Sequence, residues 1–419
     1  MKRQAITTLL ALAAATLIAP AAHAETTLRL FMGGGNRPDL MRKMFDLYEQ
    51  RNPGVKVVIE SGGATSELQR RYLSTVLAAR DKSLDIMQID IASPAQFMTA
   101  QWIEPLDGPL NGNASTLLKP FMPGFAKANV VDGKVATLPV FVDAQFLFYR
   151  KDLLEKYKLP VPRTWDELAS TSRTIMDGEK QPSLQGLSIQ GAPIEGTVCT
   201  FLTPYWSQGK EIVDANGKLT MDTAAAERGM NMWVGLLDKG VLKKNIAEVK
   251  TQDTTIDFRA GNAVFASTWG LIWSRLQEGD SPVKDKVGIA ALPAMTGGKS
   301  ASCAGGWQWA VSAFSTQKKP AAALVQWLAS LEVAKFLAIN GAFLPAYPEL
   351  YQDADVRKAM PWAAALGPTL EGAHPRPVSA RYSEMSDIIR TQTSAILGRS
   401  QTVPAGVGDI ESRLRRVAR

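Results

Sequence analysis

The composition is that of a folded globular chain long enough for two or three lobes. Its 419 residues are 46% hydrophobic and 21% charged, which excludes disordered, fibrous and membrane-embedded classes. The 47 Lys+Arg against 40 Asp+Glu give a net charge of +7 without any basic block, so we expect no nucleic-acid binding. Two His and two Cys without metal-binding spacing predict neither a metal site nor a cofactor.

The N-terminal segment has the pattern of a cleavable export signal. Two basic residues precede an apolar stretch over 5–18, and Ala22-His23-Ala24 is a small-residue cleavage site. A membrane anchor is the alternative, which the short apolar stretch disfavours. We therefore predict a signal peptide over 1–24, cleavage after Ala24 and a periplasmic mature protein.

Strand and helix signals then alternate, as in an α/β domain. Predicted strands cover 27–32, 55–60 and 84–90, and the helices between them begin at Pro38 and near Ser66. In open parallel sheets, ligands bind outside the carboxyl ends of the strands. Asp90 and the glycine turn over 33–35 are therefore placed for binding.

The second part of the chain continues the α/β pattern. An apolar extended run over 136–149 contains Asp143. Burying a charged side chain in such a run costs free energy, so Asp143 is expected to have a specific role. Thr164 to Glu167 matches a capping box. Helices are predicted over 151–158, 165–176, 224–238, 320–340 and 383–397, and strands over 263–267 and 287–292. His374 is the only histidine after the signal and no G-x-S-x-G motif occurs, which argues against a Ser-His-Asp hydrolase.

Seven short segments follow the signal in a recognisable order. They are NPGVKV at 52–57, QRR at 69–71, WIEPLD at 102–107, LPVFVD at 138–143, FYRKDLLEKY at 148–157, GGW at 305–307 and PRPV at 375–378. In this order they resemble the bacterial extracellular solute-binding proteins of carbohydrate ABC importers, most closely the trehalose- and maltose-binding branch. The resemblance extends along nearly the whole mature chain.

The resemblance implies a two-lobed α/β fold, the type II periplasmic-binding-protein fold, in which each lobe is a mainly parallel sheet flanked by helices. One lobe would comprise 25–140 plus 311–345, and the other 145–306 plus 346–419. A hinge of several segments would lie near 141–144, 307–310 and 343–347. A monomer of this kind closes on a sugar and delivers it to the transmembrane subunits of an ABC permease, whose ATPase works on the cytoplasmic side.

The resemblance also implies a set of sugar-binding residues. A neutral saccharide needs carboxylates and guanidinium groups for its hydroxyls, and flat aromatic rings for its C–H faces. Glycines let the backbone approach the ligand closely. The implied residues are Thr65, Arg70, Asp90, Phe141, Asp143, Trp269, Gly306, Trp307 and Arg376.

Six of these residues also have a structural interpretation. Asp90 could cap a helix that begins near Ser93. Asp143 could be a buried hinge carboxylate paired with an arginine. The two tryptophans could be core residues, and the two arginines could form surface ion pairs.

Two positions depart from the family pattern and leave the identity of the sugar open. Arg37 stands where several trehalose and maltose binders carry a glutamate, and Phe141 where a tyrosine is frequent. Arg37 leads to the hypothesis of a ligand with an acid group, such as a uronate. A panel in which only neutral disaccharides bind would contradict it.

Cys199 and Cys303 are the only two cysteines. An oxidising compartment permits a disulfide between them, and two buried thiols are the alternative. Reducing and non-reducing mass spectrometry distinguishes these states.

We expect a binding protein and no enzyme. The alternative is an exported glycoside-processing enzyme that uses Asp90 and Asp143, which requires the two carboxyl groups to lie about 5–9.5 Å apart across the glycosidic bond. Formation of a product would distinguish the two functions.

Overall fold

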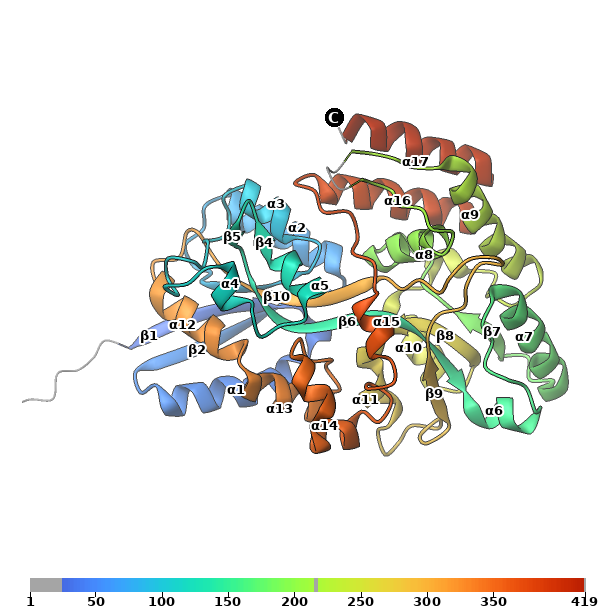
Figure 1. The fold of residues 1–419 in the computed structure, drawn as a ribbon, viewed down its shortest axis with the longest axis horizontal. Coiled ribbons are helices and arrows are strands. Elements are labelled where there is room, and N and C mark those ends of the chain that lie inside the picture. Colours follow the sequence, from blue (N-terminus) through green and yellow to red (C-terminus); the bar gives the residue numbers. More distant parts are fainter. Residues whose placement is uncertain (1–24, 215–217, 418–419) are drawn as a thin grey trace, which may run out of the picture.

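The chain forms two α/β lobes that share one β-sheet (Figure 1). The computed structural model describes residues 25–214 and 218–417, so the predicted signal peptide lies outside the described residues. The strands are β1 Thr26–Met32, β2 Val55–Ser61, β3 Ile86–Asp90, β4 Val130–Val131, β5 Lys134–Val135, β6 Leu138–Arg150, β7 Gln185–Ser188, β8 Ala263–Trp269, β9 Val287–Ala290 and β10 Ala304–Val311.

Helices cover the sheet in both lobes (Figure 1). The α-helices are α1 Pro38–Arg51, α2 Ser66–Ala78, α3 Pro94–Thr99, α4 Ala114–Leu117, α5 Pro123–Ala126, α6 Lys151–Lys156, α7 Trp165–Glu179, α8 Glu195–Trp206, α9 Thr223–Asp238, α10 Thr251–Arg259, α11 Trp273–Leu276, α12 Lys318–Leu328, α13 Leu331–Gly341, α14 Ala354–Ala359, α15 Gly367–Glu371, α16 Tyr382–Leu397 and α17 Val403–Val417. Short 3-10 helices are η1 Gly34–Asn36, η2 Lys127–Asn129, η3 Ile246–Glu248, η4 Gly270–Ile272 and η5 Pro348–Gln352.

The main sheet has the order β2-β1-β3-β10-β6-β8-β7, with β9 also paired to β6. Strand β1 is parallel to β2 and β3, and β7 is parallel to β8. Strands β6 and β10 run antiparallel to their neighbours. The predicted two-lobed α/β fold is confirmed, and its sheet is mixed because the strands that connect the lobes run against the others.

Strand β6 pairs with strands of both lobes. Its residues 138–144 pair with β10, whereas residues 145–150 pair with β8 and β9. All side chains over 138–148 are buried, as expected for a strand covered on both faces. Asp143 therefore lies near the point where β6 passes from one lobe to the other.

The two lobes can be named by their elements in Figure 1. The first lobe contains β1 to β5 and α1 to α5, with α12 and α13 packed beside them, and the second contains α6 to α11, β7 to β9, α16 and α17. In the first lobe, α1 begins with Pro38 at its first position, as the sequence predicts, and Asn52 is its C-cap residue. The apolar face of this helix, which includes Met41, Phe45 and Tyr48, is buried.

The prediction of a single helix over 320–340 is wrong, because the helix is broken. The segment forms two helices, α12 and α13, that meet at an angle of 56°. Ser330 caps α13, because its hydroxyl accepts a hydrogen bond from the backbone N–H of Val333. Within the described ranges no single helix is long and apolar enough to cross a membrane, and this bent pair passes that test only when its two helices are taken together.

Candidate functional site

A cavity of about 380 Å³ lies between the lobes, within the size range of small-molecule sites. Eight of the predicted sugar-binding residues line it: Thr65, Asp90, Phe141, Asp143, Trp269, Gly306, Trp307 and Arg376. The other lining residues are Gly35, Asn36, Ala64, Ser66, Glu67, Gln69, Ile194, Glu195, Gly196, Thr251, Gln252, Thr255, Ile256, Leu271, Ile272, Arg275 and Gly305. The structure thus brings together residues that are far apart in the sequence.

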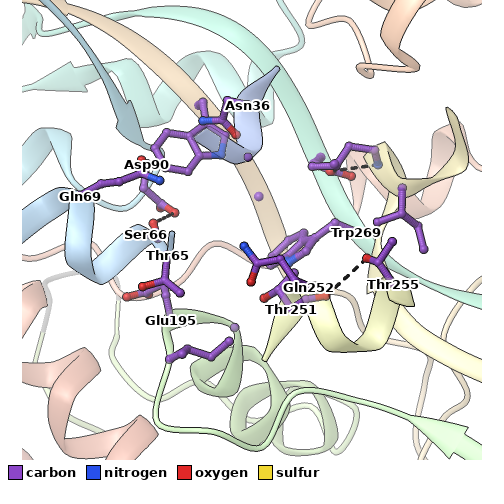
Figure 2. A pocket seen from close by; sticks show the side chains of 18 of the residues that line it. Asn36, Thr65, Ser66, Gln69, Asp90, Glu195, Thr251, Gln252, Thr255 and Trp269 are labelled. Carbon is purple, nitrogen blue, oxygen red and sulfur yellow. Dashed lines mark hydrogen bonds between the residues drawn. The ribbon is translucent and has the colours of Figure 1, made fainter. Parts of the chain in front are cut away.

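The cavity has two polar walls that come from different lobes (Figure 2). Ser66 and Gln69 of α2 and Asp90 at the end of β3 form one wall, and α10 with Thr251 and Gln252 forms the other. The walls touch at one rim, where the amide Nε2 of Gln252 donates to the Ala64 carbonyl at 2.8 Å.

Two glycines of β10 shape the space around the predicted aromatic residues. A Cβ on Gly305 would lie 2.4 Å from the Trp269 ring, so the indole packs directly on this backbone. Gly306 has a φ of +127°, and a Cβ there would lie 2.6 Å from the Phe141 carbonyl oxygen. Trp269 and Trp307 are only partly buried and line the cavity, so neither is an ordinary core residue. The glycines make room for the indole and for β6, a role that the sequence prediction did not include.

Asp143 is held by backbone N–H groups, and no arginine of the described residues pairs with it. Its Oδ1 accepts from Ala144 at 2.8 Å and Gly270 at 2.9 Å, and its Oδ2 accepts from Leu271 at 3.4 Å. Burial raises the pKa of Asp143 to about 7, although the three backbone hydrogen bonds act in the opposite direction. The carboxyl group therefore fixes the start of η4 against β6 at the edge of the cavity.

Asp90 is bound by the protein on both of its oxygen atoms. Oδ1 accepts from Arg376 Nη2 at 2.6 Å and from the Ala92 N–H at 2.9 Å, while Oδ2 accepts from the Ser66 hydroxyl at 2.7 Å. The N-cap residue of α3 is Ser93, so Asp90 does not cap that helix. Arg376 belongs to the loop before α16, and its ion pair with Asp90 links the two lobes.

Glu195, at the first position of α8, is a residue of the cavity wall that the sequence analysis missed. Its carboxylate accepts from Arg70 Nη2 at 3.1 Å, Arg376 Nη1 at 2.9 Å, the Ser386 hydroxyl at 2.7 Å and the Tyr382 hydroxyl. Burial raises the pKa of Glu195, but the two guanidinium groups and the two hydroxyl hydrogen bonds outweigh burial and hold this pKa well below its ordinary value. Because Arg70 belongs to α2, this network also joins the lobes.

Arg70 and Arg376 are buried, so the alternative of surface ion pairs is wrong for both. Arg70 does not line the cavity, because its guanidinium group is committed to Glu195 below the polar wall. Arg37 does not line it either, since its guanidinium group binds the carboxylate of Asp39. The structure therefore gives no contact through which Arg37 would select an acidic ligand.

Two side chains on the cavity wall carry buried polar atoms without a hydrogen-bond partner. They are the Oε1 of Gln69 and the Nε of Arg376. The other end of the Gln69 amide donates to the Gly63 carbonyl at 3.0 Å. A buried acceptor and a buried donor left unpaired cost free energy, and hydroxyl groups of a ligand supply both kinds of partner.

The two cysteines are joined by a disulfide in the structure. Cys199 of α8 and Cys303, directly before β10, have Cα atoms 5.7 Å apart, and both are fully buried. Over residues 25–214 and 218–417, no group of three or more His, Cys, Asp or Glu side chains is arranged to hold a metal ion. His374 is not part of the cavity, because its ring stacks on Trp206 and contacts Glu211.

The chain is similar to known binding proteins along almost its whole length. A probable ABC transporter-binding protein of Deinococcus radiodurans is 30% identical over 415 residues, which are 97% of each chain. A mannitol-binding protein of Pseudomonas aeruginosa is 24% identical over 345 residues, 78% of this chain and 74% of that one. The solved structure of maltose-bound T. maritima MalE3 has a TM-score of 0.88 and 31% identity, with 94% of this chain and 100% of that chain covered.

The fold extends to more distant structures. A mannitol-bound solute-binding protein of Agrobacterium vitis S4 has a TM-score of 0.80 at 23% identity, with 94% of this chain and 98% of that chain covered. The model of the family described as bacterial extracellular solute-binding protein matches residues 34–335. These relatives are binding proteins and not enzymes, and the chain belongs to the bacterial extracellular solute-binding proteins.

Proposed function

We propose that the protein is the periplasmic component of an ABC importer and captures a neutral sugar or polyol in the cavity between its lobes. The observation that carries this proposal is the cavity itself, in which a partly exposed indole lies opposite a polar wall with unpaired hydrogen-bonding atoms. An aromatic face and convergent polar groups are what a saccharide requires.

The charges around the cavity favour a neutral ligand. Asp90 and Glu195 are neutralised by Arg376 and Arg70 within the protein, so neither of these two buried guanidinium groups is left to pair with a ligand acid. Maltose in the T. maritima structure and mannitol in two relatives support a neutral polyhydroxylated ligand. We propose a disaccharide of the maltose or trehalose type first, and a hexitol second.

Individual roles follow from the contacts. Trp269 would stack on a sugar ring, with Trp307 and Phe141 as further apolar surface. Gln69 Oε1 would accept a hydrogen bond from a ligand hydroxyl, and Arg376 Nε would donate to one. Thr65, Asp90 and Asp143 would complete the polar surface, and Gly306 would give the ligand access to the backbone.

We also propose the division into lobes that the sequence suggested, 25–140 plus 311–345 and 145–306 plus 346–419, with β6 in the hinge. Closure around the ligand would present both lobes to the transmembrane subunits of a permease as a monomer. The glycoside-processing alternative is less well supported, because both oxygen atoms of Asp90 and of Asp143 are already engaged by protein donors.

A thermal-shift screen of residues 25–419 tests the proposal against maltose, trehalose, sucrose, mannitol, ribitol and glucuronate. Ligand at a hundredfold excess over Kd should add about 2.7 kcal/mol to stability. Calorimetry on the best ligand should then show at least about tenfold weaker binding for Trp269→Ala, because stacking and burial of the sugar face are lost.

Trp327→Ala is the matched control, because Trp327 is a partly buried indole of α12 outside the cavity. Its affinity should equal that of the wild type. If no member of the panel raises the melting temperature, the carbohydrate assignment fails. If the sugar is consumed on long incubation, the enzyme alternative replaces it.

A further inference from the structure

A second hollow lies between the lobes, next to the cavity but almost entirely separate from it. We call it the arginine groove; it has a volume of about 730 Å³ and shares only Glu67 with the cavity. Its residues are Glu67, Arg70, Arg71, Ser74, Gln96, Trp102, Arg381, Ser383, Glu384, Asp387, Ile388, Arg390, Arg413, Arg416 and Val417. One side is formed by α2 and α3 of the first lobe and the other by α16 and α17 of the second, which face each other in Figure 1.

The groove carries more positive charge than the protein itself neutralises. Six arginines and three carboxylates line it. Arg381 pairs with Glu384. Arg390 pairs with Asp387, and Arg70 pairs with Glu195 at the base of the polar wall.

The three remaining arginines are Arg71, Arg413 and Arg416. None of them makes an ion pair with any carboxylate of the described residues within 4.0 Å. Arg71 and Arg416 are exposed, and Arg413 is partly buried. The unbalanced charge is therefore accessible from solvent.

A purely structural role accounts for only one of the three unpaired arginines. A cation in the last turn of α17 stabilises the helix dipole, which explains Arg416. Arg413 and Arg416 are three residues apart and so lie on the same face of α17, while Arg71 lies in the middle of α2 in the other lobe. Like charges that face one concave surface repel each other unless an anion lies between them.

We propose that the arginine groove binds an acidic segment of a partner polypeptide. An extended segment fits better than a small anion, because the groove is open and places the partly exposed side chains of Trp102 and Val417 beside the arginines. Carboxylates accept the forked hydrogen bonds of guanidinium groups, and the apolar side chains contact the methylene groups of the segment.

The two sides of the groove belong to different lobes, so the acidic segment contacts both lobes at once. Its affinity therefore depends on how the two lobes are arranged. A bridge already crosses at this place, where the Ser383 hydroxyl donates to the Gln96 side-chain oxygen. A partner bound here favours the arrangement of lobes that forms the groove. The proposal goes beyond sugar capture and stands without it, because none of the three unpaired arginines lines the cavity.

The test titrates the mature chain into a fluorescein-labelled peptide of alternating aspartate and glutamate. Fluorescence anisotropy measures binding of the peptide at low and at physiological ionic strength. The wild type should bind the peptide saturably, with affinity that falls as salt rises. The Arg413→Gln/Arg416→Gln variant should bind roughly tenfold more weakly, and Arg71→Gln in the opposite lobe should also weaken binding.

Arg357→Gln/Lys358→Gln is the matched control, since these two exposed basic residues lie in the last turn of α14 and the charge change is the same. This control should bind like the wild type, and all variants should stay folded, with stability losses of no more than about 1 kcal/mol from weaker helix-dipole stabilisation. The proposal is overturned if the wild type does not bind, or if the control loses as much affinity as the groove variants. It is also overturned if inorganic phosphate binds the groove as tightly as the peptide, which would make it a small-anion site.

Discussion

Replacing Glu195 by glutamine should destabilise the protein far more than the loss of one hydrogen bond. Arg376 would keep its ion pair with Asp90 at 2.6 Å, but Arg70 has no other carboxylate partner among the described residues. Only 6% of the Arg70 side chain is exposed, so the variant would contain a buried cation without its counterion. Removing one partner of a buried ion pair typically costs about 3–5 kcal/mol.

Urea unfolding followed by tryptophan fluorescence measures this loss directly. Glu332→Gln is the control, because Glu332 pairs with Arg51 while both side chains are about half exposed, at 49% and 50%. The control should lose less than about 1 kcal/mol. Removing Arg70 together with Glu195, as Glu195→Gln/Arg70→Met, should recover part of the stability, and the double-mutant cycle gives the coupling energy.

The pH dependence gives the experiment a second readout. The folded-state pKa of Glu195 is lowered, so its stabilisation is complete above the unfolded pKa and is lost as the pH falls through the folded pKa. The difference between wild type and Glu195→Gln should therefore shrink below about pH 4. A loss at neutral pH no larger than that of Glu332→Gln would refute the argument that this carboxylate holds the lobes together.

Three further predictions concern single positions. Asp143 has a folded pKa of about 7 against an ordinary value of 3.8, so the free energy of unfolding should fall by up to about 4 kcal/mol as the pH rises between these values. Asp143→Asn should flatten that slope in urea titrations, and an unchanged slope would contradict the burial argument. Cys199→Ser/Cys303→Ser opens a loop with a sequence separation of 104 and should lower the free energy of unfolding by about 2–4 kcal/mol. Urea unfolding with and without reductant measures this loss, and equal stability of variant and wild type would show that the disulfide contributes nothing. Gly306→Ala puts a Cβ 2.6 Å from the Phe141 carbonyl oxygen at a residue with positive φ, and should lower the free energy of unfolding in urea by about 1–3 kcal/mol. An unchanged free energy of unfolding would mean that β6 and β10 can separate there.

Local patterns were enough to predict most of the secondary structure. The alternation of strands and helices up to Asp90 and the capping box at Thr164 are found where the sequence placed them. The break at Ser330 was missed because the apolar period continues on both sides of it, and only the N-cap hydrogen bond to Val333 reveals two helices. Strand β10 was missed because its pairing partners lie in β3 and β6, more than a hundred residues earlier.

The polar network could not be predicted for a related reason. Glu195 contacts Arg70 and Arg376, which are 125 and 181 residues away. Nothing in the adjacent sequence distinguishes it from an ordinary acidic residue in the first turn of a helix. Arg37 was considered as a ligand contact because several trehalose and maltose binders carry a glutamate at its position, whereas its guanidinium group binds the carboxylate of Asp39, two residues away.

The position of β10 affects the order in which the chain can fold. Strand β3 is complete at residue 90 and the first half of β6 at residue 144, yet each keeps an unpaired edge until β10, which begins at residue 304, is inserted between them. Until β10 is inserted, the first lobe presents strand edges that can pair with other chains. A truncated chain that ends before β10 should therefore aggregate.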